Sequence, residues 1–389
     1  MKKNASYTLM LVCLLFISQI TFAQTKQEQK SDKSPFLFEK GNTSIKFGGF
    51  IRAVTFADFG GSVPNYDFIS STQSAPNVWD NESRLSFDAS ATRLNLKVVQ
   101  KIDKLGDIEF FVETDFRGAS DVLRLRQAYV SFAGFTFGQT WSFMSDLPAN
   151  APTIDIQGVN SRTFFRTPLI GYRHSFDNGL SLGIALEFPK VKMGTLSGIK
   201  AINQNYPDVP IYVQYKNKNG HIKLAGVVRN LEYGNVAGEK IKSEVGLGVQ
   251  LSGMHKFGKS FSIYSQIIYG KGIARYINDL AALNLDLVAD NVNGGVQAIP
   301  MYGASLGIKA DLSKSLYFTS NYSVSGISVK DNYYSAKDYF RGSYYSASLF
   351  WGVVKNLTIA GEYIHGYRQN MDLSLGNANR AQLMVMYSF

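Results

Sequence analysis

The chain has 389 residues and a formal net charge of +10, from 40 Lys and Arg against 30 Asp and Glu. It contains 35 Gly, 27 Phe and 22 Tyr, but only 10 Pro and a single Cys. One cysteine excludes a disulfide framework and a thiolate metal site. After the N-terminal region, no stretch reaches the length of about 18 apolar residues that a membrane-spanning helix needs. Near-zero mean hydropathy with abundant aromatics instead fits strands that alternate between an apolar and a polar face.

The N-terminus has the pattern of a secretory signal peptide. Two lysines precede an apolar run from about Leu9 to Ile20, and Ala23 ends the small-residue segment that follows. We therefore predict a signal peptide at 1–23, with cleavage after Ala23. The only cysteine, Cys13, lies inside this segment, so the mature chain would contain none.

The predicted export of the chain determines how we interpret its basic charge. Without the two lysines of the signal peptide, 38 basic residues stand against 30 acidic ones, a net charge of +8. An exported protein rarely meets nucleic acid, so we expect no nucleic-acid partner. A cationic interior that attracts small anions is the better explanation.

Residues 24–44 are polar and charged and are predicted to form a periplasmic lead-in. From about residue 45 the chain becomes a series of alternating segments. In 180–188, for example, apolar residues at every second position alternate with Ser, Gly, Ala and Glu. This period of two predicts β-strands with one apolar face.

Seven short turns alternate with eight longer polar segments. The turns are 101–106, 133–134, 177–179, 216–220, 256–259, 312–315 and 355–356; the longer segments are about 59–85, 117–121, 142–166, 191–208, 231–241, 274–299, 328–340 and 367–379. This pattern requires about 16 strands. Short turns at one end and long loops at the other predict an all-β fold, a transmembrane antiparallel β-barrel over 45–389. Contact with lipid also requires the barrel to close, because an open edge would leave backbone groups unpaired.

The last nine residues are predicted to close the barrel. Leu383, Val385, Tyr387 and Phe389 share one face of an alternating strand that runs to the end of the chain. We expect this face to contact lipid and the strand to pair with the one that begins near residue 45.

A barrel of about 16 strands is wide enough for an aqueous channel, so its inward-facing charges would control what passes. An arginine that faced lipid at mid-depth would cost about 2–4 kcal/mol, which makes the inward orientation the favourable one. The predicted cationic pore-lining residues are Arg52, Arg93, Lys97, Arg124, Arg126 and Arg173, and the predicted counter-charges are Glu109, Glu113 and Asp115. For any single arginine, the alternative is a structural salt bridge to one of these carboxylates.

The most specific stretch is Gly-Gln-Thr-Trp-Ser at 138–142, followed by Pro-Thr-Ile-Asp at 152–155 and Gly158. Here the chain resembles the DcaP-like porin family of Gram-negative outer membranes. The resemblance covers about 48–173, with further matches at 48–52, 91–96, 125–130 and 166–172.

The resemblance implies a homotrimeric porin for negatively charged solutes, often dicarboxylates. It also implies that loop 142–166 folds inward and narrows the pore, with Asp146, Asp155, Arg162 and Arg166 shaping the constriction. The expected location is the outer membrane of a Gram-negative bacterium. The expected partners are membrane lipid, lipopolysaccharide, the barrel assembly machinery and small anionic solutes.

Two other functions compete with a porin. A barrel could serve chiefly as a surface adhesin or receptor through loops 59–85 and 274–299, or it could be a barrel hydrolase. The four histidines are scattered and no HExxH motif occurs. His174 and Ser175 are neighbours on a predicted strand, so they point to opposite faces and cannot form a dyad. We therefore predict no enzyme activity, no catalytic residue, no metal and no cofactor.

Overall fold

The computed structural model describes residues 36–61, 63–78, 83–103, 106–194, 198–235, 237–289, 296–328 and 335–389. The expected signal peptide, 1–23, and residues 24–35 of the expected lead-in lie outside these ranges. Within the described ranges, no helix has the length and hydropathy needed to cross a bilayer.

The strands of the barrel wall follow one another in chain order. They are β2 (Thr43–Phe59), β3 (Ser83–Asp88), β4 (Arg93–Ile102), β5 (Gly106–Asp115), β6 (Arg124–Phe132), β7 (Phe135–Trp141), β8 (Arg166–Ser175), β9 (Leu180–Glu187), β11 (Val209–Asn217), β12 (Gly220–Asn235), β13 (Lys240–Phe257), β14 (Phe261–Lys271), β17 (Pro300–Asp311), β18 (Leu316–Ile327), β19 (Tyr339–Val354), β20 (Leu357–Asn370) and β21 (Leu375–Ser388).

The remaining elements are short. The additional strands are β1 (Leu37–Lys40), β10 (Ile199–Ala201), β15 (Val288–Ala289) and β16 (Val296–Gln297). The 3-10 helices are η2 (Ser70–Thr72), η4 (Ala119–Asp121), η5 (Leu147–Ala149), η6 (Ala274–Tyr276) and η7 (Asn278–Leu280).

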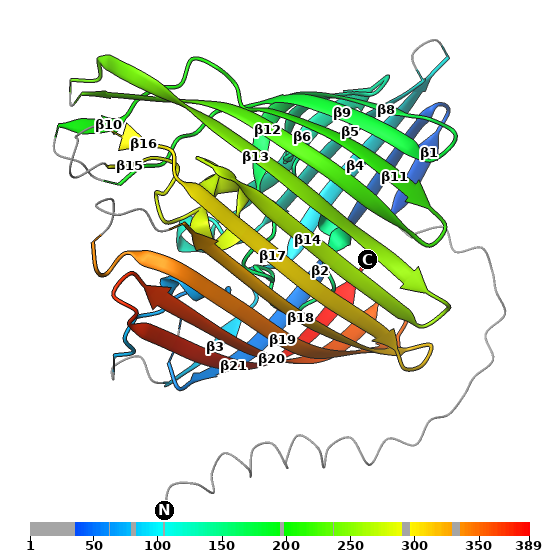
Figure 1. Ribbon diagram of the computed structural model, residues 1–389. Helices are drawn as coiled ribbons and strands as arrows, with labels where there is room; N and C mark the ends of the chain where they lie inside the picture. Colours follow the sequence, from blue (N-terminus) through cyan, green and yellow to red (C-terminus); the bar gives the residue numbers. More distant parts are fainter. Residues whose placement is uncertain are drawn as a thin grey trace, which may run out of the picture. The chain divides into compact units, whose positions relative to one another are not determined.

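Each wall strand pairs antiparallel with the next, and the wall closes into a barrel of 16 strands (Figure 1). β3 and β4 together supply the second strand, because both pair with β2, each over a different half. The predicted all-β class, antiparallel closure and strand number are confirmed. The short connections lie at the right-hand end of Figure 1 and the long ones at the other. In barrels of this type the short turns are periplasmic.

Closure occurs between β2 and β21. Their pairing runs from Phe50 opposite Ser388 to Phe59 opposite Asn379. Beyond it, the N–H of Phe389 donates to the carbonyl of Gly49 at 3.0 Å. The backbone of the final strand is therefore paired to its last residue, as expected of a strand in contact with lipid.

The sheet begins before residue 45, the boundary expected from the sequence. β1 forms a hairpin with the start of β2, with Leu37 opposite Lys46. It lies beside the part of β2 that β21 does not reach, and the ring of Phe36 packs edge-on against that of Phe389 at 5.7 Å. Residues 36–42 thus add pairing and aromatic contact where the closing strand ends.

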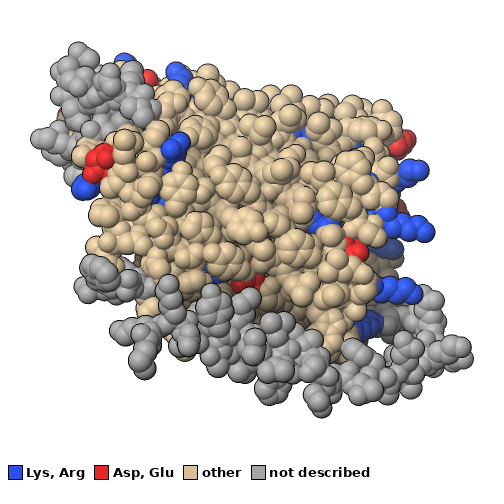
Figure 2. All heavy atoms as spheres, turned by 60° about the horizontal axis from the view of Figure 1, so that its bottom comes forward, with Lys and Arg blue, Asp and Glu red and all other residues tan. Residues whose placement is uncertain are grey.

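The outer wall is apolar, as the alternation of the sequence predicts. In β9, Leu182, Ile184 and Leu186 are exposed, whereas Ala185 and Glu187 between and after them are buried. Figure 2 shows a broad, largely uncharged band on one face of the barrel, with most charged groups near its two ends. Such a band is what a hydrocarbon environment requires.

The interior of the barrel is occupied by parts of three long connections. Phe68, from the first long connection, between β2 and β3, packs with Val159, Tyr344 and Ile364. Met144, from the third long connection, between β7 and β8, belongs to a larger buried cluster. This cluster also contains residues of η6 and η7, from the sixth long connection, between β14 and β17. The sequence pattern predicted these segments as loops but not that they fold inside.

Candidate functional site

The loop between β7 and β8, residues 142–165, lies against one side of the inner wall. The Lys223 ammonium on β12 donates to the carbonyl of Ser145 at 2.8 Å. Farther along, the Thr319 hydroxyl on β18 donates to the carbonyl of Pro152 at 2.8 Å. The loop then returns, and the Gln266 amide on β14 donates to the carbonyl of Ser161 at 3.1 Å. Inward-facing polar side chains of β12 to β20 therefore hold the loop through its backbone.

The peptide groups around Ile154 carry the strongest attachment. The Glu362 carboxylate on β20 accepts from the N–H of Ile154 at 2.7 Å and from that of Asp155 at 2.9 Å. The Arg52 guanidinium on β2 donates to the carbonyl of Ile154 at 2.5 Å. The Ile154 side chain is 1% exposed and packs with Val54, among others. Arg52 was predicted to line the pore, but it is 5% exposed and anchors the loop.

Asp155 organises the turn that follows. Its carboxylate accepts from the N–H of Gly158 at 3.0 Å and, across the interior, from that of Phe68 at 3.1 Å. Gly158 has φ +59°, and a Cβ there would lie 3.0 Å from the Arg162 guanidinium carbon. Glycine thus meets both a backbone and a packing requirement at this position. Asp155 joins the third connection to the first rather than facing the aperture.

Asp146 is also held inside the structure. Its carboxylate lies 2.9 Å from the His221 ring on β12 and 2.6 Å from the Ser252 hydroxyl on β13. Burial opposes ionisation of Asp146, but the hydrogen bonds with His221 and Ser252 outweigh it and hold the pKa of Asp146 below its usual range. Asp146 therefore fixes the start of the loop to the wall.

Arg162 lies at the junction of the three inward connections. It is 9% exposed, and its guanidinium stacks on the Phe164 ring at 3.6 Å and donates to the carbonyl of Ile156. Burial lowers the pKa of Arg162 to about 10. Its own carbonyl accepts from the N–H of Asn278 at 3.0 Å. The side chain therefore serves the packing of the loops.

A second interlock joins the first connection to η7. The Asp279 carboxylate accepts from the N–H of Ser71 at 3.0 Å, and the Ser71 hydroxyl donates to the carbonyl of Asp279 at 2.8 Å. Burial raises the pKa of Asp279 to about 8. The Arg368 guanidinium on β20 also donates to the carbonyl of Ser71 at 2.8 Å. The connections between β2 and β3, between β7 and β8, and between β14 and β17 are thus bonded to one another inside the barrel wall.

The opposite side of the inner wall, over β4 to β8, carries most of the predicted pore-lining charges. Asp115 on β5 accepts from Arg124 at 2.9 Å and from Arg126 at 2.8 Å, both on β6. Arg126 also donates to Glu113 at 2.8 Å. The structural salt bridge considered above is therefore present for these two arginines. Lys97 pairs with Glu109 in the same way, at 2.6 Å.

Three predicted cations on this side have no carboxylate partner among the described residues. Arg93 stacks on Phe50 at 5.3 Å, Arg166 on Trp141 at 4.7 Å and Arg173 on Phe143 at 4.4 Å. Arg93 interacts electrostatically with Arg126, and Arg166 interacts with Arg93, Arg124 and Arg126. The structure thus brings four of the predicted arginines into one cluster, with Asp115 and Glu113 as its acids.

Some donors of this cluster are not used within the protein. The Nε of Arg93, one Nη of Arg126 and one Nη of Arg166 are buried without an acceptor among the described residues. A buried guanidinium donor without an acceptor is costly, and a carboxylate or phosphate supplies the acceptors that it fits best. These nitrogens are themselves shielded from solvent, whereas other parts of the Arg93, Arg124 and Arg166 side chains remain partly exposed, so an anion could contact the cluster there.

The Gly-Gln-Thr-Trp-Ser stretch forms the base of the loop. Pairing between β6 and β7 ends at Gln139, whose amide donates to the carbonyl of Arg126 at 3.1 Å. The Thr140 hydroxyl then donates to Gln127 at 2.8 Å, and Trp141 packs against Phe164 at 4.7 Å. These contacts join the two ends of the loop beside the arginine cluster.

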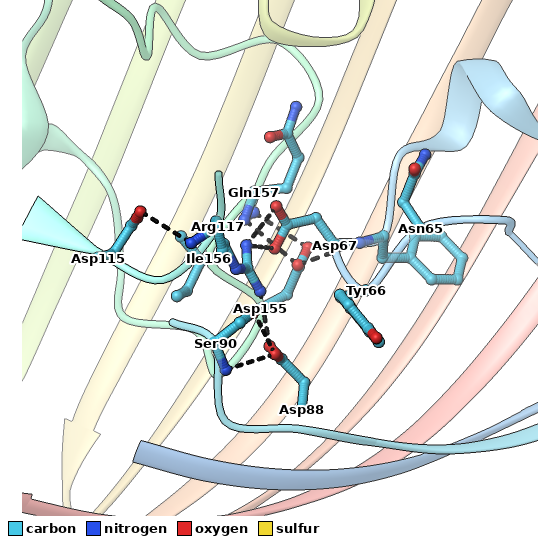
Figure 3. Close-up of polar contacts among 12 residues, drawn as sticks. Asn65, Tyr66, Asp67, Asp88, Ser90, Asp115, Arg117, Asp155, Ile156 and Gln157 are labelled. Carbon is cyan, nitrogen blue, oxygen red and sulfur yellow. Dashed lines mark hydrogen bonds and ion pairs between the residues drawn. The ribbon is translucent and has the colours of Figure 1, made fainter. Parts of the chain in front are cut away.

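The sequence analysis missed an ion-pair group at the edge of the cluster. Arg117 follows β5, and its guanidinium donates to Asp67 at 2.6 Å and to Asp88 at 2.7 Å (Figure 3). Its backbone N–H donates to the Asp115 carboxylate at 3.2 Å. Burial opposes the charged form, but Asp67 and Asp88 outweigh it and raise the pKa of Arg117. Asp115 was among the predicted counter-charges, but no local signal indicated that Arg117 would pair with a residue as distant in sequence as Asp67.

A closed barrel with an apolar outer wall, a charged inner wall and loops folded inside defines an outer-membrane channel protein. A family model described as "Porin subfamily" matches residues 40–383. The chain therefore belongs to the porin family. No curated protein matches the chain.

Solved porin structures share this fold at low sequence identity. The outer-membrane channel DcaP of Acinetobacter baumannii has 20% identity and a TM-score of 0.78, over 90% of this chain and 99% of that one. An anion-selective porin from Comamonas acidovorans has 14% identity and a TM-score of 0.61, over 89% and 100%. A trimer form of OmpT from Vibrio cholerae has 11% identity and a TM-score of 0.58, over 90% and 100%. These likenesses extend the fold to the whole barrel, well beyond the region of sequence resemblance.

Proposed function

We propose that this porin passes small anionic solutes, carboxylates among them, by diffusion along the arginine cluster. The observation that carries the proposal is the excess of cations over carboxylates in this cluster, in which Arg93, Arg124 and Arg166 are partly exposed and Arg173 is exposed. Arginine keeps its charge and offers forked donors that match a carboxylate in a bidentate pair. A solute carboxylate would bind to the exposed parts of these guanidinium groups.

Electrostatics would supply the selectivity. Six cations, Arg93, Lys97, Arg124, Arg126, Arg166 and Arg173, stand against three carboxylates, Glu109, Glu113 and Asp115. The excess positive charge raises the local concentration of anions. The carboxylates orient the guanidinium groups and keep a solute from binding too tightly to leave. This preference should weaken with salt, because the screening length falls from about 10 Å at 0.1 M to about 3 Å at 1 M.

Loop 142–166 would form the constriction, as a wall opposite the cluster. Its attachment to β12, β18 and β20 supports this role, because the loop then lines one side of the lumen, opposite β4 to β6. In this arrangement Asp146, Asp155 and Arg162 set the shape of the loop, whereas Arg166 contributes charge at its C-terminal end.

Reversal potentials in a potassium chloride gradient test the proposal. The double variant Arg93→Gln, Arg166→Gln removes two cations that have no carboxylate partner, so folding should be affected little. We expect anion preference to fall towards equal permeability, with open-channel current retained. Arg341→Gln is the control, since Arg341 is exposed and bonded to Gln369 at 2.8 Å on β20. Cation preference in the wild type, or an unchanged preference in the double variant, would contradict the proposal.

The biological setting follows from the same family. We propose that residues 1–23 direct export, that the barrel assembly machinery inserts the chain into a Gram-negative outer membrane containing lipopolysaccharide, and that it works there as a homotrimer. The OmpT trimer form supports the last point at the level of the fold. Cross-linking of the protein in native membranes, followed by electrophoresis without heating, would distinguish a trimer from a monomer.

A further inference from the structure

The periplasmic turns differ in charge around the barrel. Between β11 and β20, the turns at 216–220, 256–260, 312–315 and 354–356 contain six lysines and no Asp or Glu. These lysines, the rim lysines, are Lys216, Lys218, Lys256, Lys259, Lys314 and Lys355, and all are exposed. The turns between β4 and β9 carry acidic residues as well, such as Asp103 and Asp177. One sector of the periplasmic edge is therefore strongly cationic.

Five of the rim lysines, all except Lys355, have no described acid as an ion-pair partner. Lys216, Lys256 and Lys259 form no ion pair with any described carboxylate, and the same is true of Lys218 and Lys314. Asp311, the nearest acid at the end of β17, is paired with Lys309. Figure 2 shows several basic groups that project from the right-hand edge of the barrel, the end with the short turns. Five uncompensated lysines along one edge attract an anionic partner.

Aromatic residues place the rim lysines at the depth of the membrane interface. Phe257 and Phe261 lie on either side of the 256–260 turn with their rings 6.3 Å apart, and both are exposed on the outer wall. Tyr215 is likewise exposed, directly before Lys216. Aromatic rings of this kind lie at the headgroup level, so lysines in the adjoining turns, such as Lys218 and Lys259, reach the phosphates of the periplasmic leaflet.

A groove in the lipid-facing wall adjoins these turns. It has a volume of about 340 Å³ and lies across β11 to β14. Its floor exists because small residues face outward: Gly253 on β13 is opposite both Ile222 on β12 and Ser265 on β14. Leu251 and Ile263 line it together with Ile222, and His255 lies at the end nearest the turns. An apolar groove with a basic end matches an acyl chain with an anionic headgroup.

We propose that this groove and the rim lysines bind an anionic phospholipid, of the phosphatidylglycerol class, from the periplasmic leaflet. The acyl chain would lie over Gly253 and Ser265, and the phosphate would contact Lys218 or Lys259, which lie in the turns beside the groove. A lipid is the partner that fits, because the groove opens on the hydrocarbon-facing wall and only a membrane component reaches both parts. The site is separate from the pore, so it stands whether or not the channel selects anions.

Spin-labelled lipids in vesicles measure this binding directly. The full-length protein is reconstituted in phosphatidylcholine with spin-labelled phosphatidylglycerol or phosphatidylcholine, and the motionally restricted fraction is compared. We expect the wild type to favour phosphatidylglycerol by roughly 3- to 10-fold at 0.1 M salt, since lysines near a headgroup each add a modest attraction. The preference should approach unity at 1 M salt.

Two variants and a matched control locate the site. Lys218→Gln, Lys259→Gln should abolish the preference, whereas Lys40→Gln, Lys101→Gln, at the same end of the barrel but outside the cationic sector, should retain it. Ser265→Phe should fill the groove and lower the restricted phosphatidylglycerol while every lysine remains. Heat-modifiable electrophoretic mobility verifies that each variant is folded.

Several outcomes would overturn the proposal. These are no preference in the wild type, persistence of the preference in the rim variant, and an equal loss in the control. An unchanged restricted fraction in Ser265→Phe would also overturn it, because the groove would then hold no lipid. Failure of anion selectivity in the bilayer experiment above would leave these lipid results unaffected.

Discussion

The Glu362 carboxylate on β20 accepts a hydrogen bond from the backbone N–H of Ile154 at 2.7 Å. The two residues are far apart in sequence, and Arg52 on β2 holds the carbonyl of the same Ile154. One residue of the inward loop is thereby fixed at both of its backbone polar groups by charged side chains from two wall strands. Hydrogen bonds to charged groups are among the stronger ones, so this point should determine how rigidly the loop is held.

Glu362→Gln tests this attachment. One carboxylate oxygen would become an amide NH₂ that faces a backbone N–H, so one of the two contacts to Ile154 and Asp155 would turn from attraction to repulsion. We expect destabilisation of about 1–3 kcal/mol. Single-channel recordings should show more frequent current fluctuations.

Glu244→Gln is the matched control, because Glu244 pairs with Lys242 toward the extracellular end of β13, away from the loop. If the Glu362→Gln channel shows no more current fluctuations than the control and is equally stable, the loop is held by packing alone.

Asp115→Asn tests the balance of charge in the arginine cluster. Asp115 accepts from both Arg124 and Arg126, so its neutralisation adds one net positive charge to the pore. We expect stronger anion preference at low salt, and the difference should shrink at 1 M salt. Stability should fall by about 1–3 kcal/mol, because the buried Arg126 loses one charged partner and retains Glu113.

Reversal potentials and thermal unfolding in detergent give the two readouts for Asp115→Asn. Asp177→Asn, an exposed change in a periplasmic turn, serves as the control. Weaker anion preference in Asp115→Asn would mean that the arginines lose their orientation, and that their orientation affects selectivity more than the net charge of the pore does.

The sequence predicted the wall far better than the interior. The period of two placed Leu182 outward and Arg126 inward correctly, because side-chain direction in a strand is a local property. It could not show that Arg52 binds the loop or that Arg117 lies between Asp67 and Asp88. These partnerships depend on barrel curvature and on the paths of three long connections, which no local pattern contains.

The buried acids near the loops illustrate the same limit. Asp155 and Asp146 were expected at the constriction because of their place in the loop, and a carboxylate in a loop is usually solvated. Both are buried, since backbone N–H groups, His221 and Ser252 supply their hydrogen bonds. Partners that lie more than 60 residues away in the sequence decide whether such a group faces water or protein.

Asp279 should make stability depend on pH. Its pKa is raised to about 8 by burial, above the usual value for an aspartate, so the folded state binds the proton more tightly than the unfolded chain. The stabilisation is therefore complete at acidic pH, below the unfolded pKa, and is lost as the pH rises through about 8. The affected contact is the interlock with Ser71.

Unfolding midpoints measured in detergent between pH 5 and pH 9, compared for wild type and Asp279→Asn, test this expectation. Asparagine retains an acceptor for Ser71 but carries no charge, so the fall in midpoint at high pH should be smaller in the variant. Asp338→Asn, in the extracellular connection before β19, is the control. Parallel pH profiles for wild type and Asp279→Asn would show that other groups set the dependence.

Deletion of Phe389 should impair assembly more than selectivity. Its N–H is bonded to the carbonyl of Gly49, its own carbonyl accepts from the N–H of Gly49 at 3.3 Å, and its ring packs on Phe36. Without it, the closing pair would lose its last two backbone bonds beside the membrane interface. The arginine cluster lies on β4 to β8, on different strands, and would remain intact. We therefore expect a several-fold smaller fraction of heat-modifiable protein in the membrane, and an unchanged reversal potential for the channels that do form.

Phe389→Tyr retains the ring and the backbone and should assemble normally. A shifted reversal potential at normal assembly yield would mean that the end of the chain acts on the pore rather than on closure of the barrel.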